Sequence, residues 1–245
     1  MRNIWIIAKK EYISFYHSPI AYVIGVVTFL TLGIFFWLQI DFAVQTQQFV
    51  PDIRNILDIL IFPLFFLAVP VLTMRTISDE NRTGTLELIM TAPVRDWELV
   101  VGKWLGTYLF ILTIIALTWI YPFVLNFMVD PGIDQSLLTA NYLGLSLLTA
   151  AMTAIGVLLS SLFKNQIAAL IASLGVLIIL WIISAPAQLM QGVGADLLRH
   201  LSITDHYYET FRYGIVDLKD IIYYLSMTVL ALFLGTRAVE ARRWR

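Results

Sequence analysis

The sequence predicts an all-α polytopic integral membrane protein with six transmembrane helices. Of the 245 residues, 59% are hydrophobic and only 13% are charged, whereas an ordinary soluble domain carries about 25% charged residues. Uncharged apolar runs recur along the chain, and a helix needs about 20 such residues to cross the hydrocarbon core of a bilayer. The charged residues gather between these runs. We therefore expect one membrane domain that occupies residues 1–245.

Residues 2–16 precede the first apolar run and predict a helix that lies in the membrane interface. Charged and aromatic side chains alternate there at helical spacing, and aromatic rings favour the headgroup level. No apolar stretch ends in a small-residue cleavage site, so we expect a retained segment and not a signal peptide. The residues that we assign to this interfacial helix are Trp5, Lys9, Lys10, Glu11 and Tyr12.

Six apolar runs without a polar face predict the spans, which excludes a buried helical core of a soluble protein. They lie at about residues 20–38, 57–77, 104–128, 139–163, 166–185 and 220–238. The second span contains Pro63 and Pro70, which predict a kink or a local irregularity. Pro186, together with Gly192 and Gly194, is expected to end the fifth span.

The distribution of Lys and Arg predicts the orientation. An even number of spans places both termini on one side, and that side holds twelve of the sixteen cations, against four on the other. The acidic residues lean the opposite way, with ten of seventeen on the second side. We therefore expect both termini and the loop over residues 75–103 to be cytoplasmic.

Several function classes are excluded by what the sequence lacks. The spans carry almost no ionisable groups, which argues against a transporter driven by protons or sodium, because the coupling ion must be bound at depth. The G-x-x-x-x-G-K-[ST] and H-E-x-x-H patterns are absent, so we expect neither an ATPase site nor a zinc peptidase. A net charge of −1 and no basic stripe argue against nucleic acid. If the chain drives transport, the energy comes from another subunit.

The loop over residues 75–103 is densely charged between two apolar spans. Within it, residues 85–92 predict a short helix with Thr85 as N-cap and Glu87 near its positive end. Leu86, Ile89 and Met90 form one apolar edge, and Gly84 and Pro93 bracket the helix. Two readings are open: a helix that docks on a soluble partner, or an amphipathic helix that lies on the headgroups.

Several motifs in register along the chain resemble a known family. They are DENRTGTLEL at residues 79–88, APV at 92–94, VGK at 101–103, KKE at 9–11, SPIAY at 18–22, DHY at 205–207 and GIVDLKD at 214–220. The first three resemble the cytoplasmic signature of ABC transporter permeases of the second type, an exporter-like family. The remaining motifs resemble its gliding-motility and copper-enzyme-maturation branch.

The resemblance implies a permease subunit in the plasma membrane of a bacterium or archaeon. ATP and Mg²⁺ would bind a separate cytoplasmic ATPase subunit, with no cofactor in this chain. A second permease copy or a sister permease, membrane lipid and an extracytoplasmic accessory protein are the other implied partners. The residues implied to couple to the ATPase are Asp79, Glu80, Arg82, Gly84, Thr85, Leu86, Glu87, Ile89, Met90 and Pro93. The alternatives are a non-transporting membrane scaffold or a passive channel, and the substrate stays open.

The last external loop, residues 196–220, could hold a metal site or form a short helix. His200 and His206 suggest a metal site, but they lack i, i+4 spacing and no cluster of thioethers accompanies them. We therefore expect no metal, and a short external helix capped by Thr204 or Asp205. The loop residues singled out by the resemblance are Asp205, His206, Gly214, Asp217 and Asp220.

Small residues four positions apart predict close contact between helices, mostly within one subunit. The pairs are Gly102/Gly106, Ala150/Ala154 and Ala168/Ala172.

Overall fold

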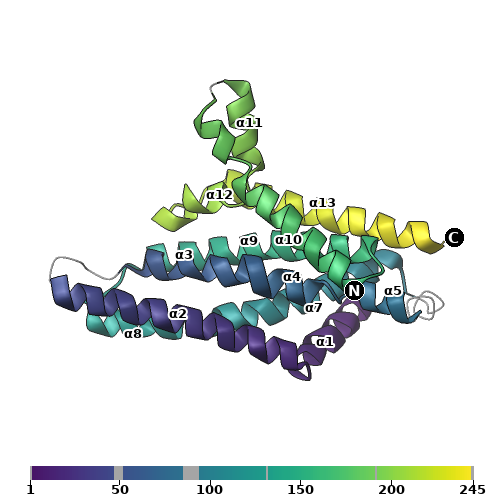
Figure 1. The fold of residues 1–245 in the computed structure, drawn as a ribbon, viewed down its shortest axis with the longest axis horizontal. Coiled ribbons are helices and arrows are strands. Elements are labelled where there is room, and N and C mark those ends of the chain that lie inside the picture. Colours follow the sequence, from purple (N-terminus) through teal and green to yellow (C-terminus); the bar gives the residue numbers. More distant parts are fainter. Residues whose placement is uncertain (1, 47–51, 85–93, 131, 191, 244–245) are drawn as a thin grey trace.

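A computed structural model of the chain describes all residues except 1, 47–51, 85–93, 131, 191 and 244–245 (Figure 1). The described residues form helices and connecting turns, with no strand among them. Six helical stretches are long and apolar enough to cross a membrane, which confirms the predicted fold class. They are Pro19–Thr46, Ile53–Thr83, Asp96–Met128, Gln135–Leu162, Gln166–Ala187 and Leu218–Arg242.

Several of these stretches comprise more than one element. The elements are α1 (Arg2–Tyr16), α2 (Pro19–Thr46), α3 (Ile53–Pro63), η1 (Leu64–Ala68), α4 (Val69–Thr73), α5 (Ser78–Thr83), α7 (Asp96–Leu117), α8 (Ile120–Met128), α9 (Gln135–Leu162), α10 (Gln166–Ile182), η2 (Ala185–Gln188), α11 (Val193–Leu201), α12 (Asp205–Tyr208), η3 (Phe211–Tyr213) and α13 (Leu218–Arg243). The helices continue past the predicted apolar segments at most ends, because polar residues there extend the same helical turns beyond the hydrocarbon.

The second span is irregular where its two prolines predict it. A π-helical turn, η1, separates α3 from α4 and lies between Pro63 and Pro70. Proline has no N–H to donate within a helix, so neighbouring carbonyls must find other partners, and a widened turn is one way to supply them. The observed irregularity therefore agrees with the prediction.

The third span is divided between α7 and α8. The sequence analysis predicted one uninterrupted helix over residues 104–128. At the break, the Thr118 hydroxyl donates to the Ile115 carbonyl at 2.6 Å and lies 3.0 Å from the Tyr142 hydroxyl of α9. Pro122 stands four residues after Thr118, and it has no N–H to donate to the Thr118 carbonyl. The interruption therefore lies where this proline breaks the helix, and the contact with Tyr142 accompanies it.

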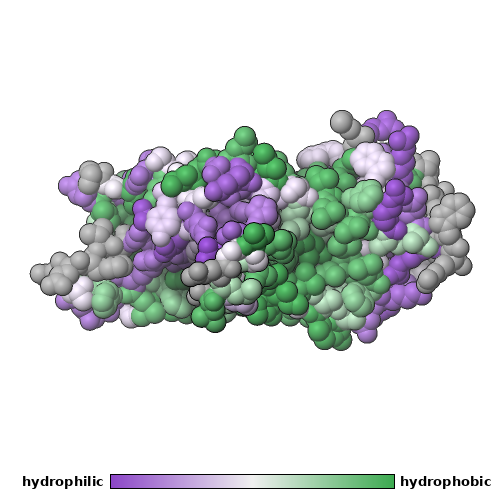
Figure 2. All heavy atoms as spheres, turned by 90° about the horizontal axis from the view of Figure 1, so that it is seen from above, coloured by the Kyte–Doolittle hydropathy of each residue, from purple (hydrophilic) through white to green (hydrophobic). Residues whose placement is uncertain are grey.

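Helix α9 is the centre of the bundle. Of the residues in its most apolar 18-residue stretch, 72% are buried, and the helix packs against α13, α10, α7 and α4. Helices α2 and α10 lie at the periphery, because only 22% and 17% of the residues in their most apolar stretches are buried. Hydrophobic atoms form a broad band on the face drawn in Figure 2, with hydrophilic atoms toward the two ends of the long axis. This distribution suits a bundle set across a bilayer.

Both ends of the described chain lie at the same end of the bundle, which we call the terminal end (Figure 1). Helix α1 lies there against α7, and α5 ends beside it. Between α10 and α13, the chain leaves the bundle and α11 projects from its side (Figure 1). The two regions that sequence reasoning singled out are therefore separate: one at the terminal end, and one in the α11–α12 connection.

Candidate functional site

The second span ends in a short stretch that we call the hub segment (residues 74–84). It consists of a turn over residues 74–77 followed by α5, which carries Asp79, Glu80 and Arg82. Gly84 ends α5 in the left-handed conformation, with φ 74°, which glycine adopts at little cost. The predicted coupling positions Thr85, Leu86, Glu87, Ile89, Met90 and Pro93 follow directly and lie outside the described residues.

A buried lysine of α7 holds the hub segment. Lys103 is 4% exposed, and its ammonium lies 2.8 Å from Glu80 of α5 and 3.5 Å from Glu11 of α1. It also donates to the backbone carbonyl of Thr76. A buried ammonium needs partners of this kind because desolvation without them is costly. We call Lys103, Glu80 and Glu11 the lysine node; it joins three separate elements.

Two glycines of α7 bring α1 close enough for Glu11 to reach the node. A Cβ at Gly102 would lie 2.8 Å from the Ile7 side chain. A Cβ at Gly106 would lie 2.6 Å from the Ala8 carbonyl oxygen and 2.6 Å from the Glu11 Cβ. The Gly102/Gly106 spacing therefore marks a close helix contact within one subunit, as predicted, and its partner is the N-terminal helix.

Side chains at three further helices fasten the hub segment. The Ser160 hydroxyl of α9 accepts from the backbone N–H groups of Ile77 and Ser78, each at 3.0 Å. The Gln166 amide at the start of α10 donates to Asp79 at 2.6 Å. At the start of α2, the Ser18 hydroxyl accepts from the Arg75 guanidinium at 2.9 Å.

The hub segment is thus joined to five other helices at the terminal end of the bundle, to α2, α7, α9 and α10 directly and to α1 through Lys103. A pocket of about 230 Å³ opens beside it, with Lys10, Arg75 and Asp79 on its wall. Oε2 of Glu80 is buried and has no hydrogen-bond partner within the described part of the chain. The arrangement joins the end of the second span to the neighbouring helices.

The predicted interfacial residues divide between two faces of α1. Trp5 is 59% exposed, and Lys9 and Lys10 are also exposed. Glu11 turns inward to the lysine node, and the Tyr12 hydroxyl lies 3.1 Å from the Thr113 hydroxyl of α7. Helix α1 therefore packs on the bundle with one face and leaves an aromatic and basic face open.

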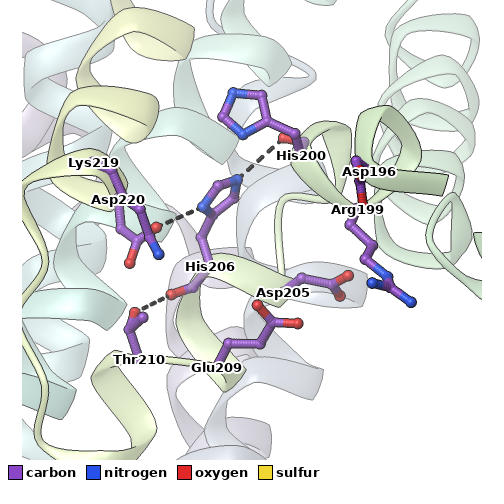
Figure 3. Close-up of a pocket in the computed structure, with 9 residues that line it drawn as sticks. All are labelled: Asp196, Arg199, His200, Asp205, His206, Glu209, Thr210, Lys219 and Asp220. Carbon is purple, nitrogen blue, oxygen red and sulfur yellow. Dashed lines mark hydrogen bonds and ion pairs between the residues drawn. The ribbon is translucent and has the colours of Figure 1, made fainter. Parts of the chain in front are cut away.

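A second cluster, which sequence analysis places on the external side and which we call the external cluster, is built around His206 of α12 (Figure 3). Its Nδ1 lies 2.7 Å from Asp220 and its Nε2 lies 3.1 Å from the His200 carbonyl. Its ring stacks on Tyr223 with centroids 3.8 Å apart. The carbonyl can only accept a hydrogen bond, so the Nε2 must donate to it. One further proton must then lie between Nδ1 and Asp220, whose other oxygen is buried without a partner among the described residues.

The other external residues singled out from the sequence have structural partners. Asp205 accepts from the Ser184 hydroxyl at 3.1 Å. Gly214 follows η3 with φ 80° and lies against Leu137 of α9. Asp217 accepts from the backbone N–H of Lys219 at 3.1 Å, and this bond, with the nearby Lys219 ammonium, lowers the pKa of the Asp217 carboxyl.

The short helix expected in this loop exists as α12 (Asp205–Tyr208), with Thr204 at its N-cap position; its side of the membrane stays a prediction. Thr204 forms no side-chain capping bond; instead, the Ser202 hydroxyl accepts from the Asp205 N–H at 3.3 Å. A second short helix, α11, was not foreseen. Across the described ranges, no group of three or more His, Cys, Asp or Glu side chains is placed to hold a metal ion.

Sequence reasoning missed three residues that the structure makes important: Lys103 as the centre of the node, Ser160 and Asn141. The buried Asn141 amide donates to the Phe211 carbonyl at 2.9 Å, and its oxygen accepts from the Tyr207 hydroxyl at 3.0 Å. A lysine flanked by Gly102 and Gly106, directly before an apolar span, was a usable signal, since a cation on a close-packing face must be paired. Ser160 and Asn141 gave none.

Six apolar spans in a helical bundle, with a charged hub at one end, define a polytopic membrane protein. The sequence model of the family described as "ABC-2 family transporter protein" matches residues 5–240. The chain therefore belongs to the ABC-2 family of transporter proteins, and it is a permease-type membrane component. The match does not distinguish a branch within the family. Comparison with curated protein sequences gives no match.

Proposed function

We propose that the chain is the permease subunit of an ATP-driven transporter, powered by a separate ABC ATPase that binds at the terminal end. The observation that carries this proposal is the hub segment. Its last described residue, Gly84, leads directly into residues 85–93, for which the sequence predicts a docking helix. Any force applied at that point acts on a segment that the lysine node and Ser160 fix to other helices of the bundle.

The lysine node is the proposed route by which movement of the ATPase reaches the spans. Lys103 connects α5 to α7 and α1, Ser160 connects the turn to the central helix α9, and Gln166 connects α5 to α10. A buried network of this kind moves as a unit, because each broken contact leaves an unpaired polar group. The terminal end is then cytoplasmic, and the α11–α12 region faces the other side of the membrane.

Reconstitution tests this proposal. The purified chain alone is expected neither to bind nor to hydrolyse ATP, whereas the chain purified with its ABC ATPase hydrolyses ATP. In that complex, Lys103→Met is expected to leave ATPase binding intact while lowering transport per ATP hydrolysed. Lys164→Met, at an exposed lysine of the same end, is the matched control.

The outcomes also separate the alternatives. A scaffold would bind the partner but move no substrate, in the wild type as in Lys103→Met. A passive channel would conduct without the ATPase. Saturable nucleotide binding to the isolated chain would contradict the proposed division of labour.

A further inference from the structure

An apolar groove lies between α1 and α7, on the face of α1 that does not reach the lysine node. It has a volume of about 490 Å³, and Trp5, Ile13 and Leu109 supply apolar parts of its wall. Trp5 and Ile13 are 59% and 42% exposed, so this wall is open to the surroundings of the bundle. In a membrane-spanning chain, an open apolar groove at an interfacial helix faces lipid.

The hydroxyl groups at the groove are already used by one another. The Thr113 hydroxyl donates to the Leu109 carbonyl at 2.9 Å, so it accepts from Tyr12 at 3.1 Å. The Tyr12 hydroxyl, having donated, accepts from Tyr16 at 2.8 Å. This directed chain leaves none of these hydroxyl protons for an occupant. Inside the groove, an occupant therefore meets an apolar surface and needs no polar group there.

Positive charge stands at the rim. Lys9 is part of the groove wall and is exposed, and it forms no ion pair with any described residue. Arg2 is exposed on the same helix seven positions earlier, which places the two cations along one face. The exposed Trp5 ring lies between them in sequence, and aromatic rings of this kind favour the headgroup level of a bilayer. The site thus combines an alkyl-sized apolar channel with an anion-binding rim.

We propose that this groove binds an anionic phospholipid, with one acyl chain along α1 and α7 and the headgroup phosphate at Lys9. The apolar walls, which have no free hydroxyl donor, favour the acyl chain of the lipid. The unpaired cations favour a headgroup that carries net negative charge. Because α1 also supplies Glu11 to the lysine node, a bound lipid would hold the same helix that holds the hub segment. The leaflet, but not the binding itself, rests on the proposed orientation.

Native mass spectrometry of the detergent-purified chain tests the site without any ATPase, so its failure is distinguishable from a failure of the proposed function. Phosphatidylglycerol and phosphatidylcholine are titrated separately. The wild-type chain is expected to retain one phosphatidylglycerol more tightly than phosphatidylcholine. Lys9→Glu is expected to lower the phosphatidylglycerol affinity about 25-fold, since an interfacial cation contributes a factor of roughly five and the anion that replaces it repels the headgroup by a similar factor. Lys164→Glu, at an exposed lysine away from the groove, is expected to change it little.

Ile13→Asp gives a second, independent readout, because it places a charge in the acyl channel and leaves the rim cations intact. It is expected to weaken both lipids, whereas Ile13→Val leaves them unchanged. Size-exclusion chromatography confirms that each variant is folded. Equal affinity for the two lipids in the wild type, or no change in either charged variant, would overturn the proposal. A change of oligomeric state in Ile13→Asp without any change in lipid retention would also overturn it, because the groove would then accommodate a second copy of the chain.

Discussion

The ammonium of Lys103 lies 2.8 Å from the Glu80 carboxylate, and this pair joins α7 to the last helical turns of the second span. Its position explains why a charged side chain is kept within a membrane bundle. The pair stands directly before the segment where a soluble partner is expected to dock, and Glu11 ties the interfacial helix to the same cation.

Lys103→Met is expected to destabilise the protein by about 3 kcal/mol, because it leaves two carboxylates without their cation in a largely buried place. Thermal unfolding of the detergent-purified chain measures the effect. Adding Glu80→Gln and Glu11→Gln is expected to recover part of the loss, since the uncompensated charges are removed. An unaltered unfolding transition in Lys103→Met would mean that the node does not hold the terminal end together.

Ser160→Ala is expected to cost about 2 kcal/mol, because the buried backbone N–H groups of Ile77 and Ser78 lose their common acceptor. The matched control is Ser226→Ala, at an exposed residue whose hydroxyl donates to the Tyr223 carbonyl of its own helix turn. The same unfolding assay applies. If both alanine variants behave alike, the hub segment does not depend on α9 in the way the hydrogen bonds indicate.

Much of the fold was predictable because the membrane imposes simple rules. Each span is built on a long uncharged apolar run, and Pro63 and Pro70 predicted an irregularity where the π-helical turn lies. The break at Thr118 was missed, although Pro122, four residues later, was a usable signal for it. The lysine node was missed for a different reason: Glu11 and Lys103 meet only after α1 has folded back on α7. The sequence shows that a charged residue near a span needs an ion-pair partner, but only the tertiary structure shows which residue that partner is.

His206→Phe keeps an aromatic ring against Tyr223 but removes both hydrogen bonds of the imidazole. It leaves the buried Asp220 carboxylate without a partner, so we expect a loss of about 3 kcal/mol. His17→Phe, at an exposed histidine, is expected to stay within about 0.5 kcal/mol of wild type. Adding Asp220→Leu to His206→Phe is expected to restore stability in part. A His206→Phe protein as stable as wild type would show that the external cluster does not fasten α12 to α13.

Cysteine labelling tests the orientation without ambiguity, because the native chain has no cysteine. Single cysteines at Arg82 and Lys164 are expected to be protected from an impermeant reagent added outside intact cells. Cysteines at Gln135 and Val193 are expected to react with it. All four positions are exposed, so a failure to react is due to the membrane and not to burial. Reaction of Arg82→Cys and Val193→Cys from the same side would contradict the six-span topology.

The most direct measurement of the central claim is a photo-crosslink from the hub segment to the ATPase. A photoreactive amino acid replaces Thr83, an exposed residue at the end of α5, and a parallel variant carries it at Gln135, an exposed residue at the opposite end of the bundle. After illumination of intact cells, the Thr83 variant is expected to form an adduct that contains a P-loop ATPase, and the Gln135 variant none. No ATPase adduct from Thr83, or equal adducts from both positions, would contradict the assignment of the hub segment as the point where the ATPase drives the permease.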